Sequence, residues 1–284
     1  MAGLAFLLWP GAASAETQIP VVAAESFYGD VARQIGGPQV AVTSIISSAM
    51  QDPHEFEPSP SVARAVVGAQ VVILNGASYD PWMDKLLAAT SPARRSVIVA
   101  ADLVHRKPGD NPHLWYDPAT MPAVAAQIAG ALARHDPMHK DAYRQRLAAF
   151  LASLVPIDDA IRTIKSQYGG TPVTATEPVF GDMARSLGLV MRNARFQLAI
   201  MNETEPSASD VAALQGDLAA HRVRILFYNA QVSDDLTTRM LGIARAAHVP
   251  VVGVSETEPA DKTYQEWIAG TLDAVRRALA DGGS

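Results

Sequence analysis

The sequence predicts an α/β protein with two domains, each built on a mainly parallel sheet, joined by one long rigid helix. Three observations support this fold class. Short, continuous runs of apolar and β-branched residues recur along the chain, as in strands buried on both faces of a parallel sheet. Helix-like stretches separate these runs, and repeated strand–helix alternation is typical of parallel α/β folds. A strand-free span with helical periodicity, residues 137–168, interrupts the alternation near the middle of the 284-residue chain.

The expected strands, in chain order, lie at 19–24, 40–46, 71–75, 96–101, 171–176, 224–229 and 249–254. Several expected helices begin with a polar residue followed by proline. These pairs are Ser59-Pro60, Asp80-Pro81, Asp117-Pro118 and Asp136-Pro137. In each pair we expect the polar side chain to cap a helix whose first residue is the proline.

The central span 137–168 reads as one long helix. Its apolar residues recur at helical spacing, at positions 143, 147, 150, 151, 154, 157, 161 and 164. Pro156 is a place for a bend, and Gly169-Gly170 ends the pattern. We therefore expect an N-terminal α/β domain at 16–136, a linker helix at 137–167 and a C-terminal α/β domain at 168–284.

The first fifteen residues resemble a secretory signal peptide. An apolar run is followed by Pro10, Gly11 and small residues that end in Ala13-Ser14-Ala15, which is a small-x-small cleavage pattern. The run is too short to span a bilayer, although no Lys or Arg precedes it. We expect residues 1–15 to be removed, so that the mature chain begins at Glu16.

The composition excludes several classes of function. A net charge of -6 argues against nucleic acid and anionic membrane as partners. The absence of cysteine rules out disulfides, thiolate metal sites and lipid attachment through an N-terminal cysteine. The sequence also contains no GxxxxGK[ST], GxSxG or HExxH motif. We expect a soluble, monomeric protein outside the cytoplasm, without a lipid anchor.

Four residues of metal-binding type share one position relative to the expected strands. His54, His113, Glu177 and Glu256 each lie on a segment that follows a strand, two in each domain. In open α/β sheets ligands bind at this edge, so a cleft between the domains can bring the four together. Two neutral imidazoles and two carboxylates carry a charge of -2, which a divalent cation cancels. Buried together without a cation, the four polar groups are costly.

The segments that contain these residues resemble a known family. They are "DPHEFEPSPSVARAV", "NPHLWYDPATMPAVAAQI", "TEPVFGDMARSLGL" and "VPVVGVSETEPADKTYQEWIAGTLDAV". In order and spacing they resemble the zinc/manganese solute-binding proteins of bacterial ABC importers, over essentially the whole mature chain. The resemblance implies a periplasmic carrier, not an enzyme, that delivers its metal to a membrane permease. It also implies that His54, His113, Glu177 and Glu256 are the metal ligands.

The sequence does not decide which metal is bound, or whether Glu256 is one of its ligands. Glu177 stands where zinc-type members of the family usually have His, as in manganese-type members, and Glu256 stands where many members have Asp. Two imidazoles with carboxylates suit Zn²⁺ and also Mn²⁺. Nearby acidic residues, Asp52, Glu55 and Glu57, are expected to be solvated or to support the ligands. The other functions to weigh are a secreted mononuclear metalloenzyme, which keeps an open coordination position, and a surface adhesin.

Overall fold

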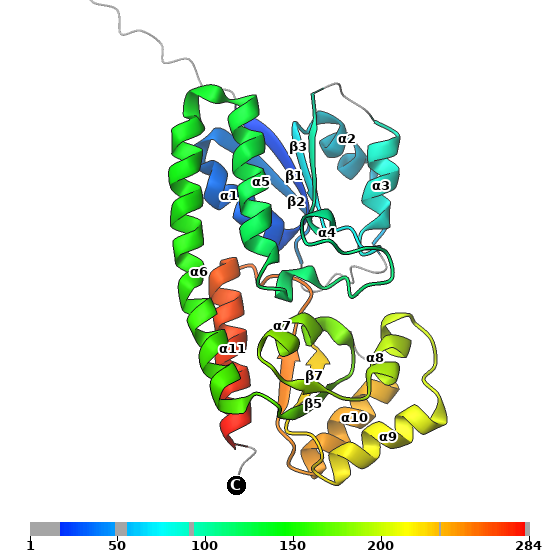
Figure 1. Ribbon diagram of the computed structural model, residues 1–284. Coiled ribbons are helices and arrows are strands. Elements are labelled where there is room, and N and C mark those ends of the chain that lie inside the picture. Colours follow the sequence, from blue (N-terminus) through cyan, green and yellow to red (C-terminus); the bar gives the residue numbers. More distant parts are fainter. Residues whose placement is uncertain (1–17, 49–55, 91–93, 233, 282–284) are drawn as a thin grey trace, which may run out of the picture.

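The computed structural model describes residues 18–48, 56–90, 94–232 and 234–281, and its two sheets form two lobes (Figure 1). The predicted signal peptide, residues 1–15, lies outside the described residues. Both sheets are parallel in every strand pair that is hydrogen-bonded. This confirms the predicted fold class.

The first lobe is built on a four-stranded sheet with the strand order β2-β1-β3-β4. Its strands are β1 (Ile19–Glu25), β2 (Val40–Ile46), β3 (Val71–Leu74) and β4 (Ser96–Val99). Its helices are α1 (Ser26–Gly36), η1 (Gly37–Gln39), α2 (Pro60–Gly68), α3 (Pro81–Ala88), α4 (Ala100–Leu103), η2 (Leu114–Tyr116) and α5 (Thr120–His135). The chain leaves β1 toward one edge of the sheet and later returns to β3 on the other side. The switch point of the topology, where ligands bind in such sheets, therefore lies between β1 and β3.

The second lobe repeats this topology with the strand order β6-β5-β7-β8. Its strands are β5 (Pro172–Ala175), β6 (Val190–Met191), β7 (Leu226–Asn229) and β8 (Val251–Val254). Its helices are η4 (Pro178–Phe180), α7 (Gly181–Ser186), α8 (Ala194–Met201), α9 (Ala208–Ala219), α10 (Asp235–Ala246) and α11 (Tyr264–Asp281). The switch point lies between β5 and β7, and these strands point toward the first lobe (Figure 1).

Alternation along the strands builds a core on both faces of the first sheet. Val21 and Ala23 of β1 enter a cluster with α1 and α5, whereas Val22 and Ala24 enter a second cluster with Trp82 of α3. The first cluster continues through α6 and α11 into the second lobe, where it includes Phe227. The two lobes therefore share one apolar core.

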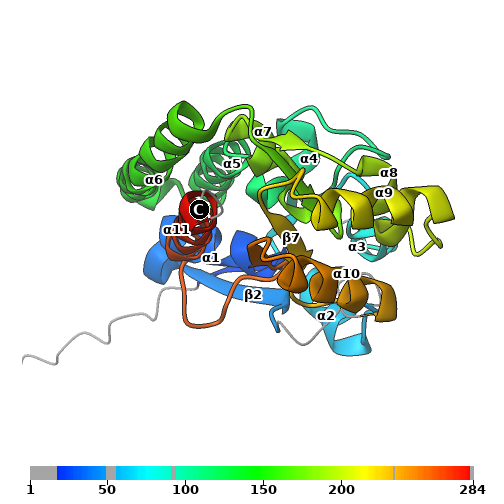
Figure 2. The same cartoon turned by 90° about the horizontal axis from the view of Figure 1, so that it is seen from below.

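Two helices join the lobes. The predicted central helix is present as η3 (Pro137–His139) followed by α6 (Lys140–Tyr168), and Pro156 lies inside α6. Helix α11 lies beside α6 and is seen end-on in Figure 2. Its first residue, Tyr264, donates from its backbone N–H to Asp30 of α1 (3.0 Å) and from its hydroxyl to the carbonyl of Trp115 (2.8 Å). The last helix thus contacts the first lobe, and the predicted boundaries at 136 and 168 stay predictions.

Three of the four predicted helix caps are wrong. Ser59 does accept a hydrogen bond from the N–H of Val62. Asp80 and Asp136 precede helical residues, but neither side chain caps its helix. The carboxylate of Asp80 turns back to the N–H groups of Asn75 and Gly76, and that of Asp136 pairs with His139 and Tyr143. Helix α5 begins at Thr120, later than the expected Pro118, while Asp117 accepts from Ala119 N–H. The short strand β6 has no counterpart among the expected strands.

None of the helices in the described part of the chain combines the length and the apolar character that crossing a bilayer requires.

Candidate metal centre

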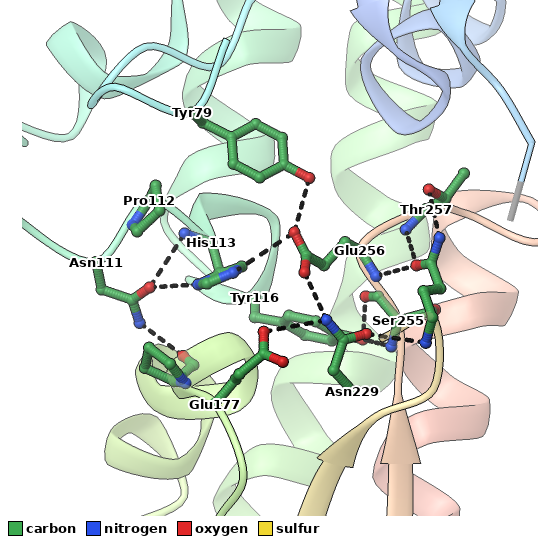
Figure 3. Close-up of polar contacts among 12 residues, drawn as sticks. Tyr79, Asn111, Pro112, His113, Tyr116, Glu177, Asn229, Ser255, Glu256 and Thr257 are labelled. Carbon is green, nitrogen blue, oxygen red and sulfur yellow. Dashed lines mark hydrogen bonds and ion pairs between the residues drawn. The ribbon is translucent and has the colours of Figure 1, made fainter. Parts of the chain in front are cut away.

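The candidate centre lies where the carboxyl ends of the two sheets face each other (Figure 3). Tyr79 comes from the segment after β3, and His113 from the longer segment after β4 and α4. Glu177 follows β5, Asn229 is the last residue of β7, and Glu256 follows β8. All five side chains belong to residues that are at most 5% exposed. The strands of a parallel sheet end at one edge, so the fold itself collects these groups.

His113 has one ring nitrogen that is hydrogen-bonded and one that faces a carboxylate. Nδ1 lies 2.6 Å from Oδ1 of Asn111, and the same oxygen accepts from the backbone N–H of His113 (3.2 Å). An amide oxygen can only accept, so the proton of a neutral His113 belongs on Nδ1. The lone pair then lies on Nε2, which is 3.6 Å from Oε2 of Glu256. Within the described residues this buried nitrogen has no hydrogen-bond partner.

Aromatic rings surround the imidazole of His113. The ring of Trp115 meets it edge-on with centroids 5.3 Å apart, and the ring of Tyr79 lies 6.2 Å away. Trp115 is fully buried. The two aromatic rings shield the imidazole of His113 from water and restrict its rotation. Its Nε2 therefore points in one direction.

Asn111 also connects the segment of His113 to the second lobe. Its amide Nδ2 donates to the carbonyl of Pro178 (2.9 Å), the residue that follows Glu177. The Cα of Gly181 lies close to the same amide, because a Cβ at that position would lie 3.1 Å from Nδ2. One side chain therefore fixes the imidazole of His113 and ties it to the backbone beside Glu177. This is the supporting role that metal-binding histidines need.

Two buried carboxylates of the second lobe share one amide donor. Nδ2 of Asn229 donates to Oε1 of Glu256 (2.6 Å) and to Oε2 of Glu177 (3.2 Å), as Figure 3 shows. Carboxylate oxygens only accept, which fixes the orientation of the amide. The remaining amide oxygen accepts from the backbone N–H of Gln231 (3.0 Å).

The backbone of Glu256 is braced by a second amide. Oε1 of Gln231 accepts from the N–H groups of Glu256 (2.5 Å) and Thr257 (2.9 Å), and its Nε2 donates to the hydroxyl of Thr257 (3.0 Å). Tyr116 from the first lobe donates to the carbonyl of Ser255 (3.1 Å). The segment after β8 is therefore held by its own lobe and by the other.

Tyr79 of the first lobe contacts Glu256 of the second from a turn with an unusual backbone. Gly76, Ala77 and Ser78 all have positive φ angles (74°, 51° and 67°), and the carboxylate of Asp80 stabilises the turn by accepting two backbone N–H groups. The hydroxyl of Tyr79 donates to Oε2 of Glu256 (3.0 Å). Burial, followed by the charge of Glu256, raises the pKa of Tyr79 well above its ordinary value of 10.0, so the hydroxyl keeps its proton.

Of the four residues predicted as ligands, the structure describes three. His113 and Glu256 approach each other, and Glu177 joins them through Asn229. His54 lies outside the described residues, as do Asp52 and Glu55, whereas Glu57 is exposed. Over the described ranges no three His, Asp or Glu side chains form a complete metal-binding group. Sequence reasoning missed Tyr79, Asn111 and Asn229. The signal that could have found Tyr79 and Asn229 is the same position at the ends of strands.

The comparisons with known proteins agree with one another. A family model described as zinc-uptake complex component A, periplasmic, matches residues 21–278. The metal ABC transporter substrate-binding lipoprotein SloC of Streptococcus mutans is 24% identical, covering 94% of this chain and 92% of its own. The manganese ABC transporter substrate-binding lipoprotein PsaA of Streptococcus pneumoniae is 23% identical, covering 89% and 84%. The solved structure of the periplasmic zinc binding protein TroA from Treponema pallidum superposes with a TM-score of 0.77 at 17% identity, covering 92% of this chain and 99% of its own. That structure shares the fold.

Proposed function

The chain belongs to the family of periplasmic zinc-uptake complex components, and we propose that it carries a divalent transition metal, zinc or manganese, to the membrane permease of an ABC importer. The metal is the cargo of the protein. The observation that supports this most directly is the buried Nε2 of His113, which has no hydrogen-bond partner within the described residues and faces Oε2 of Glu256 at 3.6 Å. A lone pair that faces a carboxylate is unfavourable unless a proton or a metal cation lies between them.

We propose four ligands for the metal, His54, His113, Glu177 and Glu256. His113 and the two carboxylates are supported by their burial and by their fixed hydrogen-bond partners. His54 is proposed from the sequence, where it follows the end of β2. Two neutral imidazoles and two carboxylates bring a charge of -2, which the cation neutralises. The donor set mixes nitrogen and oxygen, which suits zinc and manganese better than calcium or magnesium.

We propose that the protein binds and releases the metal without performing a reaction on a substrate. Four protein ligands close a site, whereas catalytic metal sites keep a position open for water or substrate. The apolar core shared by the lobes, together with the paired helices α6 and α11, favours release by a small movement of the segments around the site. We also propose that the carrier works as a monomer.

We propose that the carrier is free in the periplasm. Relatives that are named lipoproteins do not support this point. It rests on the absence of cysteine from the 284 residues, because the lipid of such anchors is attached to a cysteine. Fractionation of cells that produce the protein checks it. Release with the periplasmic contents is expected, and retention in the membrane pellet after a high-salt wash contradicts it.

Replacing His113 by alanine tests the metal site. We expect His113→Ala to lose zinc and manganese affinity by more than the about 10–100-fold that loss of a supporting hydrogen bond costs. The matched control is His139→Ala, because His139 pairs with Asp136 in the turn between α5 and α6, away from the cleft. Metal content after purification and competition titration measure the effect. If His113→Ala binds both metals as the parent does, the proposed site is wrong.

The same titration on His54→Ala tests the ligand that was proposed from the sequence. Its affinity is expected to fall by a similar factor. An unchanged affinity removes His54 from the ligand set and leaves the other three.

A further inference from the structure

The segment 104–113, which carries His113, contacts the second lobe through Arg106. This segment follows α4 of the first lobe. Nη2 of Arg106 lies 3.2 Å from Oδ1 of Asp182, the second residue of α7. Helix α7 comes soon after Glu177 in the chain and packs against η2 of the first lobe. The ion pair therefore links the segment of one proposed ligand to the segment of another.

Arg106 holds two carboxylates, one in each lobe. The same Nη2 that contacts Asp182 lies 3.0 Å from Oδ2 of Asp117, which belongs to the first lobe. The side chains of Arg106 and Asp117 are 20% exposed and that of Asp182 is 1% exposed, so water screens these charges only in part. Without the guanidinium, two negative charges from opposite lobes would face each other. The positive charge of Arg106 therefore holds the lobes together at this point.

The second cationic partner of Asp182 belongs to the same helix. Arg185 pairs with the same oxygen of Asp182 from the next turn of α7. It moves with Asp182 when the lobes separate, whereas Arg106 stays with Asp117. Each carboxylate then keeps one arginine, and water reaches Asp182. The contact between the lobes can therefore open and close again, because opening leaves neither charge without a partner.

We propose that Arg106 is a positioning residue that sets how fast the bound metal leaves. This inference rests on the proposed function of the site. His113 and the proposed carboxylate ligands come from different lobes, so release separates the segment of His113 from the second lobe. Arg106 lies in the same segment, and this movement breaks its contact with Asp182. The ion pair thus stabilises the closed site, and a metal that leaves only from the open site leaves more slowly.

Arg106→Met tests this role, and Arg185→Met is the matched control. Methionine keeps much of the apolar stem of arginine and removes the charge. Both variants take one arginine from the same carboxylate, but only Arg106→Met breaks a contact between the lobes. The probe is Zn²⁺, and stopped-flow capture by a large excess of a fluorescent zinc chelator times its release. Circular dichroism and thermal unfolding verify that each variant folds.

The expected difference is in the rate constant of release. We expect Arg106→Met to release Zn²⁺ about tenfold faster than the parent, the order of effect that follows from losing a hydrogen bond to a charged group. Arg185→Met should stay within about threefold of the parent, because its arginine is mostly exposed and pairs within one helix.

A double-mutant cycle separates the ion pair from a general loosening of the segment. In the background of Asp182→Asn, Arg106→Met has no carboxylate of the second lobe to lose. We therefore expect it to change the release rate by less than about threefold in that background. A packing defect caused by the methionine would speed release equally in both backgrounds.

The outcomes distinguish this inference from the function on which it rests. An unchanged release rate in Arg106→Met overturns the inference, as does an acceleration that persists in the Asp182→Asn background. Equal acceleration in Arg106→Met and Arg185→Met also overturns it, because the charge around Asp182 would then matter and not the contact between the lobes. In all these cases the parent still binds Zn²⁺ and the proposed function stands. A parent that binds no Zn²⁺ contradicts the proposed function, and the inference with it.

Discussion

Each lobe buries a pair of carboxyl groups beyond its strands, but the two pairs have different partners. In the first lobe, Glu25 ends β1 and Asp80 follows β3, and both residues are 1% exposed. Asp80 accepts from two backbone N–H groups, at 2.6 and 2.8 Å. Within the described residues neither oxygen of Glu25 has a hydrogen-bond partner. Burial and the charge of the neighbouring Asp80 both favour the protonated form of Glu25.

The direction of both pKa shifts agrees with a proton held by this pair in the first lobe. Burial raises the pKa of Glu25 well above its ordinary value of 4.5, and the neighbouring charge of Asp80 adds to the effect. Burial also raises the pKa of Asp80 from 3.8 to about 6. The pair is close because β1 and β3 are adjacent in the sheet. A donor between the two groups is absent from the described contacts.

In the second lobe, a strand stands between the two carboxylates and supplies an amide donor. Asn229 at the end of β7 bonds to both Glu177 and Glu256. Hydrogen bonds from a neutral donor favour the ionised carboxylate. The comparison teaches that the same edge of the same fold yields a proton-holding pair or, at the proposed metal site, a pair bridged by an amide donor, according to whether a donor lies between the groups.

The largest expected difference between the two pairs is in metal affinity. Glu256→Gln removes a proposed ligand, and we expect it to weaken zinc binding by more than about 100-fold, beyond the cost of losing a supporting residue. Glu25→Gln changes a pair that holds a proton, and we expect zinc affinity within about threefold of the parent, the scatter of an effect that is not direct. Competition titration at neutral pH measures both. Similar losses in the two variants would abolish the distinction between the pairs.

The next effect is on stability and its dependence on pH. A carboxyl group with a raised pKa holds its proton in the folded state after the unfolded chain has lost it, so the free energy of unfolding falls as the pH rises through that window. For Asp80 the window runs from 3.8 to about 6, and for Glu25 it begins at 4.5. Glu25→Gln removes one titrating group and offers an N–H donor to Asp80. Its stability relative to the parent should therefore rise with pH, by about 1.4 kcal/mol for each unit by which the pKa of Glu25 is raised.

Urea unfolding of the metal-free parent and of Glu25→Gln, at a series of pH values from acid to neutral, measures this effect. Groups outside the pair titrate alike in the two proteins, so the difference reports on Glu25 and Asp80. A difference that stays constant with pH, or that falls as the pH rises, would show that the pair does not share a proton.

Much of the fold follows from the sequence because its signals are local. Continuous apolar runs predicted β1 to β5, β7 and β8, and the position after each strand selected His113, Glu177 and Glu256. Strand β6 was not predicted, because a strand of two residues, Val190 and Met191, is too short to show an apolar pattern. An Asp-Pro pair predicts a helix cap, but the buried carboxylate of Asp80 accepts from the preceding turn instead.

The remaining features depend on tertiary partners that no local pattern specifies. The amphipathic pattern of α11 fixes its buried face, but does not say that Tyr264 will contact Asp30 in the other lobe. Asn229 and Tyr79 occupy strand-end positions, yet amide and phenol groups gain a role only once the carboxylates beside them are placed. A search of the strand ends for metal-ligating residues alone does not find them. A search that includes residues with hydrogen-bond donors finds both.

The smallest expected effect concerns Tyr79, which connects the two pairs. Its turn is held by Asp80 of the first pair, and its hydroxyl donates to Oε2 of Glu256 in the second. Tyr79→Phe removes one hydrogen bond and keeps the ring that packs against Trp115, with centroids 5.0 Å apart. We expect zinc affinity to fall by about fivefold, the equivalent of about 1 kcal/mol for a single hydrogen bond.

The two metals should respond alike to this change. Tyr79 donates to the oxygen of Glu256 that faces His113, so its loss loosens that oxygen for either metal. Zinc and manganese affinity should therefore fall together in Tyr79→Phe, with their ratio unchanged. A ratio that moves toward manganese would show that the hydroxyl of Tyr79 takes part in the choice of metal, and does not only hold Glu256 in place.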